Sequence, residues 1–159
     1  MQSMQYSEMS DLALLQLCIW REARGEPYDG KRGVAHVVRN RSLVATWWNG
    51  RILGSLSRVI LRPYQFSSFN PNDPNADKWP SDGDISFPEC CAVALAVMGG
   101  SDADNTNGAT YYFDTSIEWP AAWGAQGSYV ETLDVGRLRF FKPSPVSGLP
   151  TATLDASDQ

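Results

Sequence analysis

The sequence has few or none of the features that mark zinc proteins with several histidine ligands, membrane-spanning proteins and nucleic acid-binding proteins. It has one histidine, His36, which leaves too few imidazoles for a zinc site built from several histidines. It has no apolar run of about 18 residues, so we expect no integral membrane segment. Lys and Arg number 13 against 18 Asp and Glu, a net charge of −5. Nucleic acid binding needs clustered positive charge, so this charge argues against a nucleic acid partner.

Cysteine is also scarce, and its spacing suits neither a disulfide framework nor a metal site. Cys90 and Cys91 are adjacent, which fits neither an ordinary bridge nor a CxxC motif, so we expect these two thiols and that of Cys18 to be free and packed as small apolar groups. We expect no metal and no cofactor. The first residues lack the basic start and the cleavage site of a secretory signal. The expectation is a protein made in the cytoplasm without a signal peptide.

The chain of 159 residues, 43% of them hydrophobic, is long enough for one domain with its own core. We expect a flexible N-terminus over residues 1–9, a folded domain over 10–142 and a disordered tail over 143–159. Ser10 is a plausible N-cap for the first helix. Helices are expected over residues 12–24, from 29 to the Trp47-Trp48 pair, over 52–61, and over 89–98 with Pro88 in the first helical position.

The last third of the sequence has the alternation of short strands. We expect strands over residues 109–113, 129–133 and 138–141, with a turn at Val135-Gly136. Residues 63–88, rich in Pro, Asn, Asp and Ser, predict a long loop, and loops of that length are often functional. The predicted fold class is α+β: a mainly helical body followed by a small antiparallel sheet.

Glu22 is the acidic residue whose position points most clearly to chemistry. On a helical wheel it follows Leu15, Cys18 and Ile19 by seven, four and three residues, so it ends an apolar stripe. Partial burial there would disfavour ionisation and raise the pKa of the carboxyl toward the range of a general acid. The competing interpretation is a structural salt bridge to Arg24 or Arg41.

Glu26 follows one helical turn after Glu22. If the helix continued, the two carboxyl groups could form an acid–base pair. Gly25 and Pro27 disturb that phase, and they favour a carboxylate that fixes the turn by accepting backbone amides.

Residues 64–70 combine aromatic rings with neutral hydrogen-bonding groups. Tyr64, Gln65, Phe66 and Ser67 begin this tract, which can match the apolar faces and hydroxyl edges of sugar rings. The alternative is a loop anchored by its own aromatic side chains, which is also the safer interpretation for each of the six tryptophans.

Other polar features favour structural roles. The acidic groups at 72–77 and 81–84 lack the spacing of a calcium loop and are interpreted as turns. His36 is expected to be a packed side chain, and residues 102–105 a solvated loop.

Five blocks of sequence resemble the SleB/CwlJ family of cell wall hydrolases. Residues 22–26 read E-A-R-G-E, a signature of that family, and residues 33–41 resemble its G-x-A-x-V-I-x-N-R helix. Residues 65–67 match its Q-F-S segment. Residues 108–113 resemble its G-A-x-x-Y-Y strand, and 135–141 its closing I-G-x-H-x-F-Y. The blocks stand in family order and span roughly residues 10–142.

The resemblance implies a lysozyme-like fold and cleavage of peptidoglycan between N-acetylmuramic acid and N-acetylglucosamine, with Glu22 as the catalytic residue. It favours a lytic transglycosylase that uses one carboxyl group. The alternatives are muramidase-type hydrolysis by water and a non-catalytic wall-binding or virion module; a zinc amidase is disfavoured by the single histidine. We expect a monomer that binds glycan strands. The expected substrate-binding residues are Glu26, Tyr64, Gln65, Phe66, Ser67, Thr110 and Tyr112.

Three positions depart from the family pattern. Trp20 and Arg21 replace the commoner pair before the glutamate, which is expected to reshape the subsite beside Glu22. Leu138 stands where many members have histidine, which removes a polar contact. A catalytic domain with neither a wall-binding module nor an export signal resembles a phage endolysin, delivered to the wall after release from the cytoplasm.

Overall fold

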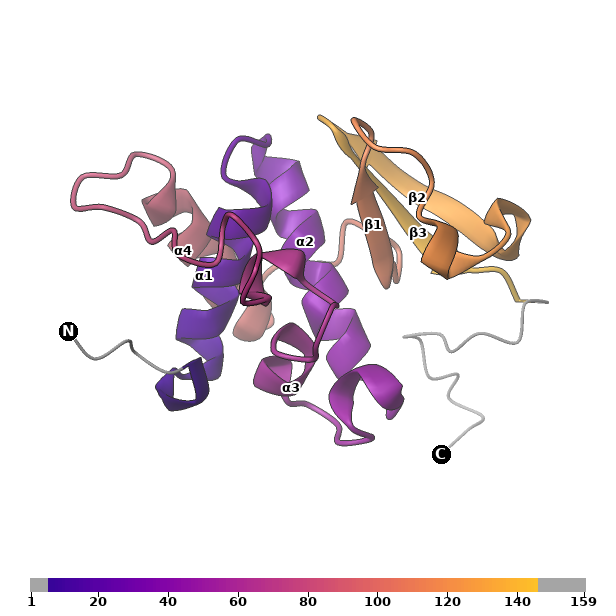
Figure 1. Cartoon of the computed structure of the whole chain (residues 1–159), viewed down its shortest axis with the longest axis horizontal. Coiled ribbons are helices and arrows are strands. Elements are labelled where there is room, and N and C mark those ends of the chain that lie inside the picture. The colour runs from indigo at the N-terminus through magenta and orange to yellow at the C-terminus, as the bar shows by residue number, and fades with distance from the viewer. Residues whose placement is uncertain (1–5, 146–159) are drawn as a thin grey trace.

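The computed structural model describes residues 6–145, in which four helices form a body beside a three-stranded sheet (Figure 1). The first helix, α1, spans Asp11–Ala23. The Ser10 hydroxyl accepts a hydrogen bond from the backbone N–H of Ala13, which satisfies one of the free amides of the first turn. The predicted cap and helix are confirmed. α1 contacts each of the other three helices, so its apolar residues are buried on most sides.

The second helix, α2, spans Tyr28–Ser42 and ends well before the tryptophan pair that was expected to close it. The chain turns back there, and Trp47–Asn49 form a separate 3-10 turn capped by Thr46. The Trp48 indole N–H donates to the carbonyl of Arg41 at 2.7 Å, and the Asn49 amide donates to the same carbonyl at 3.3 Å. These side chains provide hydrogen-bond donors for a carbonyl group in the last turn of α2, where no backbone N–H of the helix is left to bind it. The prediction of a longer helix was wrong.

The remaining helices are α3 (Leu56–Ile60), which begins later than expected behind its cap Ser55, and α4 (Phe87–Met98). Pro88 occupies the second rather than the first helical position of α4. Cys18 and Cys90 are buried in the core shared by the four helices, Cys91 is partly buried, and all three thiols are free, as predicted. The main core is therefore helical.

The sheet contains β1 (Tyr111–Asp114), β2 (Tyr129–Val135) and β3 (Leu138–Pro143), in the antiparallel order β1-β3-β2. Tyr111 pairs with Phe141, and a bulge interrupts β2 between Glu131 and Leu133. The three predicted strands are confirmed, with shifted ends. An α+β, lysozyme-like arrangement results.

A second core joins the sheet to α1 and α2. Phe140 and Leu138 pack there with Ala23 and Val34. Gly33 makes the approach possible, because a Cβ at that position would collide with the Phe140 ring. Leu138, at the family's histidine position, is 2% exposed, so its side chain serves this core.

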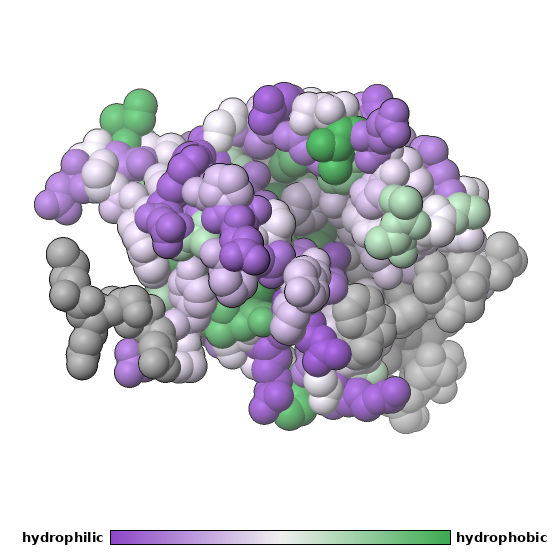
Figure 2. All heavy atoms as spheres, in the orientation of Figure 1, coloured by the Kyte–Doolittle hydropathy of each residue, from purple (hydrophilic) through white to green (hydrophobic). Residues whose placement is uncertain are grey.

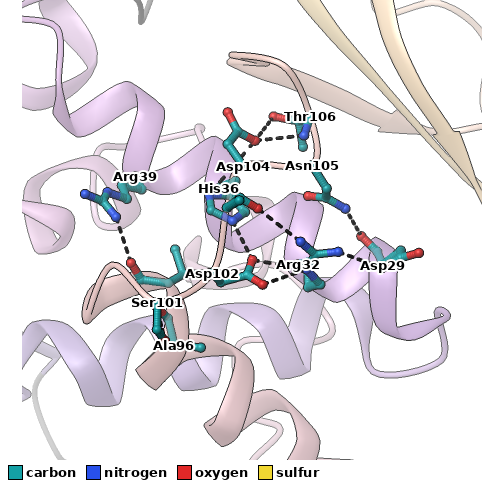
Figure 3. A network of polar contacts seen from close by, with 12 residues as sticks. Asp29, Arg32, His36, Arg39, Ala96, Ser101, Asp102, Asp104, Asn105 and Thr106 are labelled. Carbon is teal, nitrogen blue, oxygen red and sulfur yellow. Dashed lines mark hydrogen bonds and ion pairs between the residues drawn. The ribbon is translucent and has the colours of Figure 1, made fainter.

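Residues 102–105, after α4, were expected to be a solvated loop. They do form a loop, with Ala103 and Asp104 exposed, but its acidic side chains also bind α2. The Asp102 carboxylate accepts a hydrogen bond from Arg32 Nε at 3.0 Å and lies 2.7 Å from His36 Nε2 (Figure 3). The Asp104 carboxylate accepts a hydrogen bond from the side-chain amide of Asn40 at 3.0 Å. His36 is buried, as predicted, but it is also part of this network. The loop therefore packs along α2 and is bound to it by these side chains.

Part of the N-terminal segment that was expected to be flexible has regular structure. Tyr6–Glu8 form a 3-10 turn, and the Tyr6 hydroxyl donates to the carbonyl of Ala76 at 3.1 Å. The rest of the predicted N-terminus and all but three residues of the predicted tail lie outside the described residues. Within the described part of the chain, no helix is long and apolar enough to cross a membrane.

Candidate active site

Glu22 lies in the last turn of α1, where the helix meets the long loop between α3 and α4. Desolvation by the surrounding protein raises the pKa of its carboxyl to about 7, despite the Ser68 hydrogen bond and the positive charges of Arg21 and Arg41, which lower it. The Ser68 hydroxyl donates to Glu22 Oε1 at 3.4 Å. Among the described residues, no Lys or Arg forms an ion pair with Glu22, so the salt-bridge interpretation is not supported.

Glu22 lines two clefts of different character. The first, which we call the aromatic cleft, has a volume of about 570 Å³. Its walls include five aromatic side chains from the sheet and the segment before β2, namely Tyr111, Tyr112, Phe113, Trp123 and Tyr129. Gln65 and Ser67 add neutral hydrogen-bonding groups on the side of the long loop. Figure 2 shows this face of the molecule hollowed between the helical body and the sheet.

The second, which we call the charged cleft, has a volume of about 670 Å³ and lies around the end of α1. Arg24, Glu26, Asn75 and Arg137 contribute polar groups to its walls. Glu22 is the residue that the two clefts share, so they lie next to each other at the end of α1. A long linear ligand that occupies both clefts passes the carboxyl.

Arg41 supports the floor of the aromatic cleft from α2. It is 5% exposed, and its Nε donates to the carbonyl of Thr110 at 2.7 Å. Its guanidinium lies over the rings of Trp48, Phe66 and Tyr111 at 5.3–5.6 Å from their centroids. Burial lowers the pKa of this guanidinium, which nevertheless stays cationic near neutral pH. Its charge therefore acts on Glu22 from behind the cleft.

The structure brings most of the expected substrate-binding residues together. Tyr64, Gln65, Ser67 and Tyr112 line the aromatic cleft with Glu22, and Glu26 lines the charged cleft. Their contacts with a substrate stay predictions.

Two of the expected residues do not reach either cleft. Phe66 is 2% exposed beneath Arg41, and Thr110 is fully buried with its carbonyl bound to Arg41. Direct contact of these two side chains with a substrate does not fit the structure. They are part of the support for Arg41.

Glu26 fixes a turn, as one of the two sequence interpretations held. Its Oε2 accepts the backbone N–H of Arg137 at 3.1 Å, and its Oε1 lies 3.5 Å from the Arg137 Nε. Gly136 has a φ of 58° and no space for a side chain beside Glu26. The carboxylate thus ties the β2–β3 turn to the end of α1 and is not free to act as a base.

Trp20 and Arg21 hold the long loop over Glu22. Arg21 donates to the carbonyls of Ser68, Ala76 and Lys78 at 3.0–3.1 Å. The Trp20 indole N–H donates to Asp84 at 3.1 Å. Their expected effect on the subsite is therefore indirect, through the loop that carries Ser68.

Sequence reasoning missed the residues that reach the site from distant segments. Ser68 and Trp123 lie in loops whose position depends on the whole fold, and Arg24 and Arg137 come from the ends of α1 and of the β2–β3 turn. Arg41 and Tyr111 lie within sequence blocks that resemble the family, and this resemblance was the only sequence feature that pointed to them as site residues. In the part of the chain that the structure describes, no three His, Cys, Asp or Glu side chains group to hold a metal ion.

A helical body and a small antiparallel sheet, with a protonatable carboxyl in the clefts between them, define a lysozyme-like domain. The chain belongs to the SleB/CwlJ-type family: a family model described as Cell Wall Hydrolase matches residues 25–141, a stretch that begins three residues after Glu22. The role of Glu22 therefore rests on its geometry and on the sequence motif.

Comparison with curated proteins and solved structures gives the same family and fold. A spore cortex-lytic enzyme of Halalkalibacterium halodurans is 32% identical over 69% of this chain and 28% of its own length, and one of Bacillus subtilis is 30% identical over 72% and 33%. The chain thus spans about a third of these relatives. The catalytic domain of Bacillus cereus SleB superposes with a TM-score of 0.62 at 24% identity, covering 89% of this chain and all of that domain. The catalytic domain of a germination-specific lytic transglycosylase, SleB of Bacillus anthracis, gives 0.60 at 23% identity, covering 89% and 98%.

Proposed function

We propose that this chain cleaves the glycan strand of peptidoglycan between N-acetylmuramic acid and N-acetylglucosamine, as a lytic transglycosylase with Glu22 as its one catalytic carboxyl. The observation that carries the proposal is the partly buried carboxyl of Glu22, with a pKa raised to about 7, on a residue that lines both clefts. Membership of a cell wall hydrolase family supports peptidoglycan as the substrate.

The mechanism assigns both proton transfers to Glu22. In its protonated form the carboxyl donates its proton to the glycosidic oxygen, the bond from C1 of the muramoyl residue to that oxygen breaks, and N-acetylglucosamine leaves with a free 4-hydroxyl. The Glu22 carboxylate then removes the proton of the muramoyl 6-hydroxyl, whose oxygen bonds to C1. The product is a 1,6-anhydromuramoyl end, and Glu22 is protonated again. A pKa near 7 suits both roles at neutral pH.

The contacts of Glu26 support this one-carboxyl route over a mechanism that needs two carboxyl groups. Inverting hydrolysis requires a second carboxylate, about 6.5–9.5 Å away, that activates water. Glu26 is bound to the Arg137 amide and guanidinium. Asp73, whose charge raises the pKa of Glu22, accepts the backbone N–H of Asn75 at 2.7 Å.

The second candidate is hydrolysis by water, and Asp73 is the observation that favours it. Of the described carboxylates, Asp73 is the one whose negative charge raises the pKa of Glu22, so it is the candidate for a partner. In that case water, not the 6-hydroxyl, would bond to C1.

Digestion of purified sacculi in water enriched in ¹⁸O separates the candidates. We expect muropeptides with ends one water lighter than reducing ends and without ¹⁸O. Reducing ends that carry ¹⁸O would show hydrolysis instead. Binding to sacculi without any new glycan ends would show a non-catalytic module.

A further inference from the structure

The two clefts that Glu22 lines differ in charge. A strand bound across Glu22 would therefore have one end in a more cationic cleft than the other. The aromatic cleft has one cation in its walls, Arg41, which is buried. The charged cleft has three, Arg21, Arg24 and Arg137, against the carboxylate of Glu26. Glu22 itself is largely protonated below neutral pH. In a chain with a net charge of −5, the charged cleft is thus locally cationic.

Arg24 is held rigidly at the wall of the charged cleft. Its guanidinium stacks over the Trp20 ring at 4.5 Å from the centroid, and its Nη1 donates to the carbonyls of Trp20 and Arg21 at 3.3 Å. Over residues 6–145, no carboxylate lies within ion-pairing distance of it. A stacked guanidinium without an acidic partner is a preorganised donor for an anionic group.

Arg137 reaches the same cleft from the β2–β3 turn. Its side chain is 70% exposed, and it lies 3.5 Å from Glu26 and 3.2 Å from Asp114. The backbone N–H of Arg137 already binds Glu26, which fixes the turn and therefore the base of the side chain. Because the guanidinium is exposed, water screens its ion pairs with Glu26 and Asp114, and a ligand in the cleft can reach it without breaking the backbone contact.

The two sugars of the substrate differ in the same property. N-acetylglucosamine is neutral, whereas the muramoyl residue carries a lactyl ether that ends in a carboxylate, either free or extended by an acidic peptide. Guanidinium groups bind carboxylates in paired, charge-assisted hydrogen bonds. A cationic cleft on one side of the scissile bond therefore distinguishes the two sugars.

We propose that Arg24 and Arg137 form a subsite for the carboxylate-bearing substituent of the muramoyl residue, and thereby set the direction in which the strand lies across Glu22. The inference rests on the proposed function, and it places the muramoyl residue at the charged cleft and the leaving N-acetylglucosamine at the aromatic cleft.

The test measures binding in a Glu22→Gln background, so that it does not depend on turnover. Three soluble ligands are used: glycan strands with peptide stems, strands stripped by an amidase that leaves the free lactyl carboxylate, and stripped strands with their carboxyl groups converted to amides. Arg24→Gln and Arg137→Gln are compared with Arg139→Gln, an exposed arginine of β3 that pairs with Asp134 outside both clefts.

We expect each cleft variant to weaken binding of carboxylate-bearing strands about tenfold, which is the size of a lost charge-assisted hydrogen bond, and Arg139→Gln to change nothing. A loss on stem-bearing strands alone assigns the carboxylate to the peptide, and a loss on stripped strands alone assigns it to the free lactyl group. A loss on both ligands shows that the subsite accepts either carboxylate. The amide ligand should bind the wild-type clefts and the variants equally.

Equal losses on the amide ligand, or no loss on any ligand, would overturn the subsite. The ¹⁸O digestion with the unmodified chain tests the proposed function separately. Normal cleavage combined with carboxylate-independent binding would leave the proposed function in place and remove this inference.

Discussion

At the scale of single residues, the chemistry of Glu22 depends on the balance between its burial and the hydroxyl of Ser68. Burial raises the pKa of the carboxyl and the hydrogen bond from Ser68 lowers it. Ser68 is 1% exposed, so water does not compete for its hydroxyl. The hydroxyl therefore sets how far the carboxyl departs from an ordinary one.

Ser68→Ala should raise the pKa of Glu22 further, because it removes a hydrogen bond that favours the carboxylate. A carboxyl with a higher pKa keeps its proton to higher pH, so the alkaline limb of kcat/KM against pH should move to higher pH. Ser57→Ala, in α3 outside both clefts, is the matched control. Movement of that limb to lower pH would contradict the assignment of Glu22 as the acid.

Glu22 could be found from the sequence because its position on an apolar helical stripe is a local property. Ser68 could not, because its contact joins residues 46 apart through a loop. The same holds for Arg137, whose amide binds Glu26 across 111 residues. Phe66 and Thr110 were misassigned because residue type indicates what a side chain can bind, and not which way it points.

At the scale of elements, the long loop is the segment on which the site depends most. It contains one 3-10 turn, Ser67–Phe69, and its position is fixed by side chains from α1. Arg21 is the main anchor, since its guanidinium binds three carbonyls and lies 4.9 Å from the ring centroids of Phe69 and Trp79.

Arg21→Lys should loosen this loop although it keeps the charge, because an ammonium cannot reach three carbonyls in a fork. We expect a loss of about 2–4 kcal/mol in unfolding free energy, from buried carbonyls left without donors. Hydrogen exchange should become faster over residues 68–78. Arg39→Lys, whose arginine donates to the carbonyl of Val97, is the control. Unchanged exchange in the loop would contradict the anchoring role.

The loop after α4 provides a pH-dependent contribution to stability. Burial raises the pKa of Asp102, but hydrogen bonds from His36 and Arg32 outweigh it and hold the pKa below its ordinary value. A carboxyl whose folded pKa is depressed contributes stability above its unfolded pKa and loses it as pH falls through the folded one.

Asp102→Asn should therefore lower stability at neutral pH and make it less sensitive to acid. The measurement is the urea midpoint between pH 7 and pH 3 for both proteins. The curves should converge toward the acid end, below the unfolded pKa of about 3.9. A constant gap between them over the whole range would contradict the proposed linkage.

Element prediction from the sequence worked where the signal was local. The helices over 12–24 and 89–98 and the three strands follow from caps, proline and alternation. The end of α2 was missed because it is set by Trp48 and Asn49, which fold back on the Arg41 carbonyl. The contacts of the loop at 102–105 were missed because acidic residues suggest solvent until their cationic partners are known.

At the scale of the whole molecule, function depends on how the sheet is placed against the helices. The aromatic cleft draws its walls from both, so its width follows from the core between them. In that core Gly33 faces the Phe140 ring, with no space for a Cβ. The class of fold was predictable from the order of elements, but this placement was not.

Gly33→Ala should push the sheet away from α2, because the added methyl group overlaps the Phe140 ring. We expect a loss of about 1–3 kcal/mol in unfolding free energy, as for other overpacked cores, with weaker glycan binding. Gly127→Ala, with open space around its Cα and an ordinary backbone, should have little effect. Equal stability of both variants would contradict the tight interface.

The central claim is that one carboxyl performs both proton transfers, and activity of Glu22→Gln on purified sacculi tests it most directly. Glu131→Gln, an exposed residue of β2, is the control for removing a carboxylate from the chain. New glycan ends should form at the normal rate with the control and at least about 10²-fold more slowly with Glu22→Gln. The control should keep the wild-type unfolding midpoint, and Glu22→Gln should keep or raise it at neutral pH, because it removes a carboxyl whose pKa is raised by burial. Full activity of a folded Glu22→Gln would contradict the account.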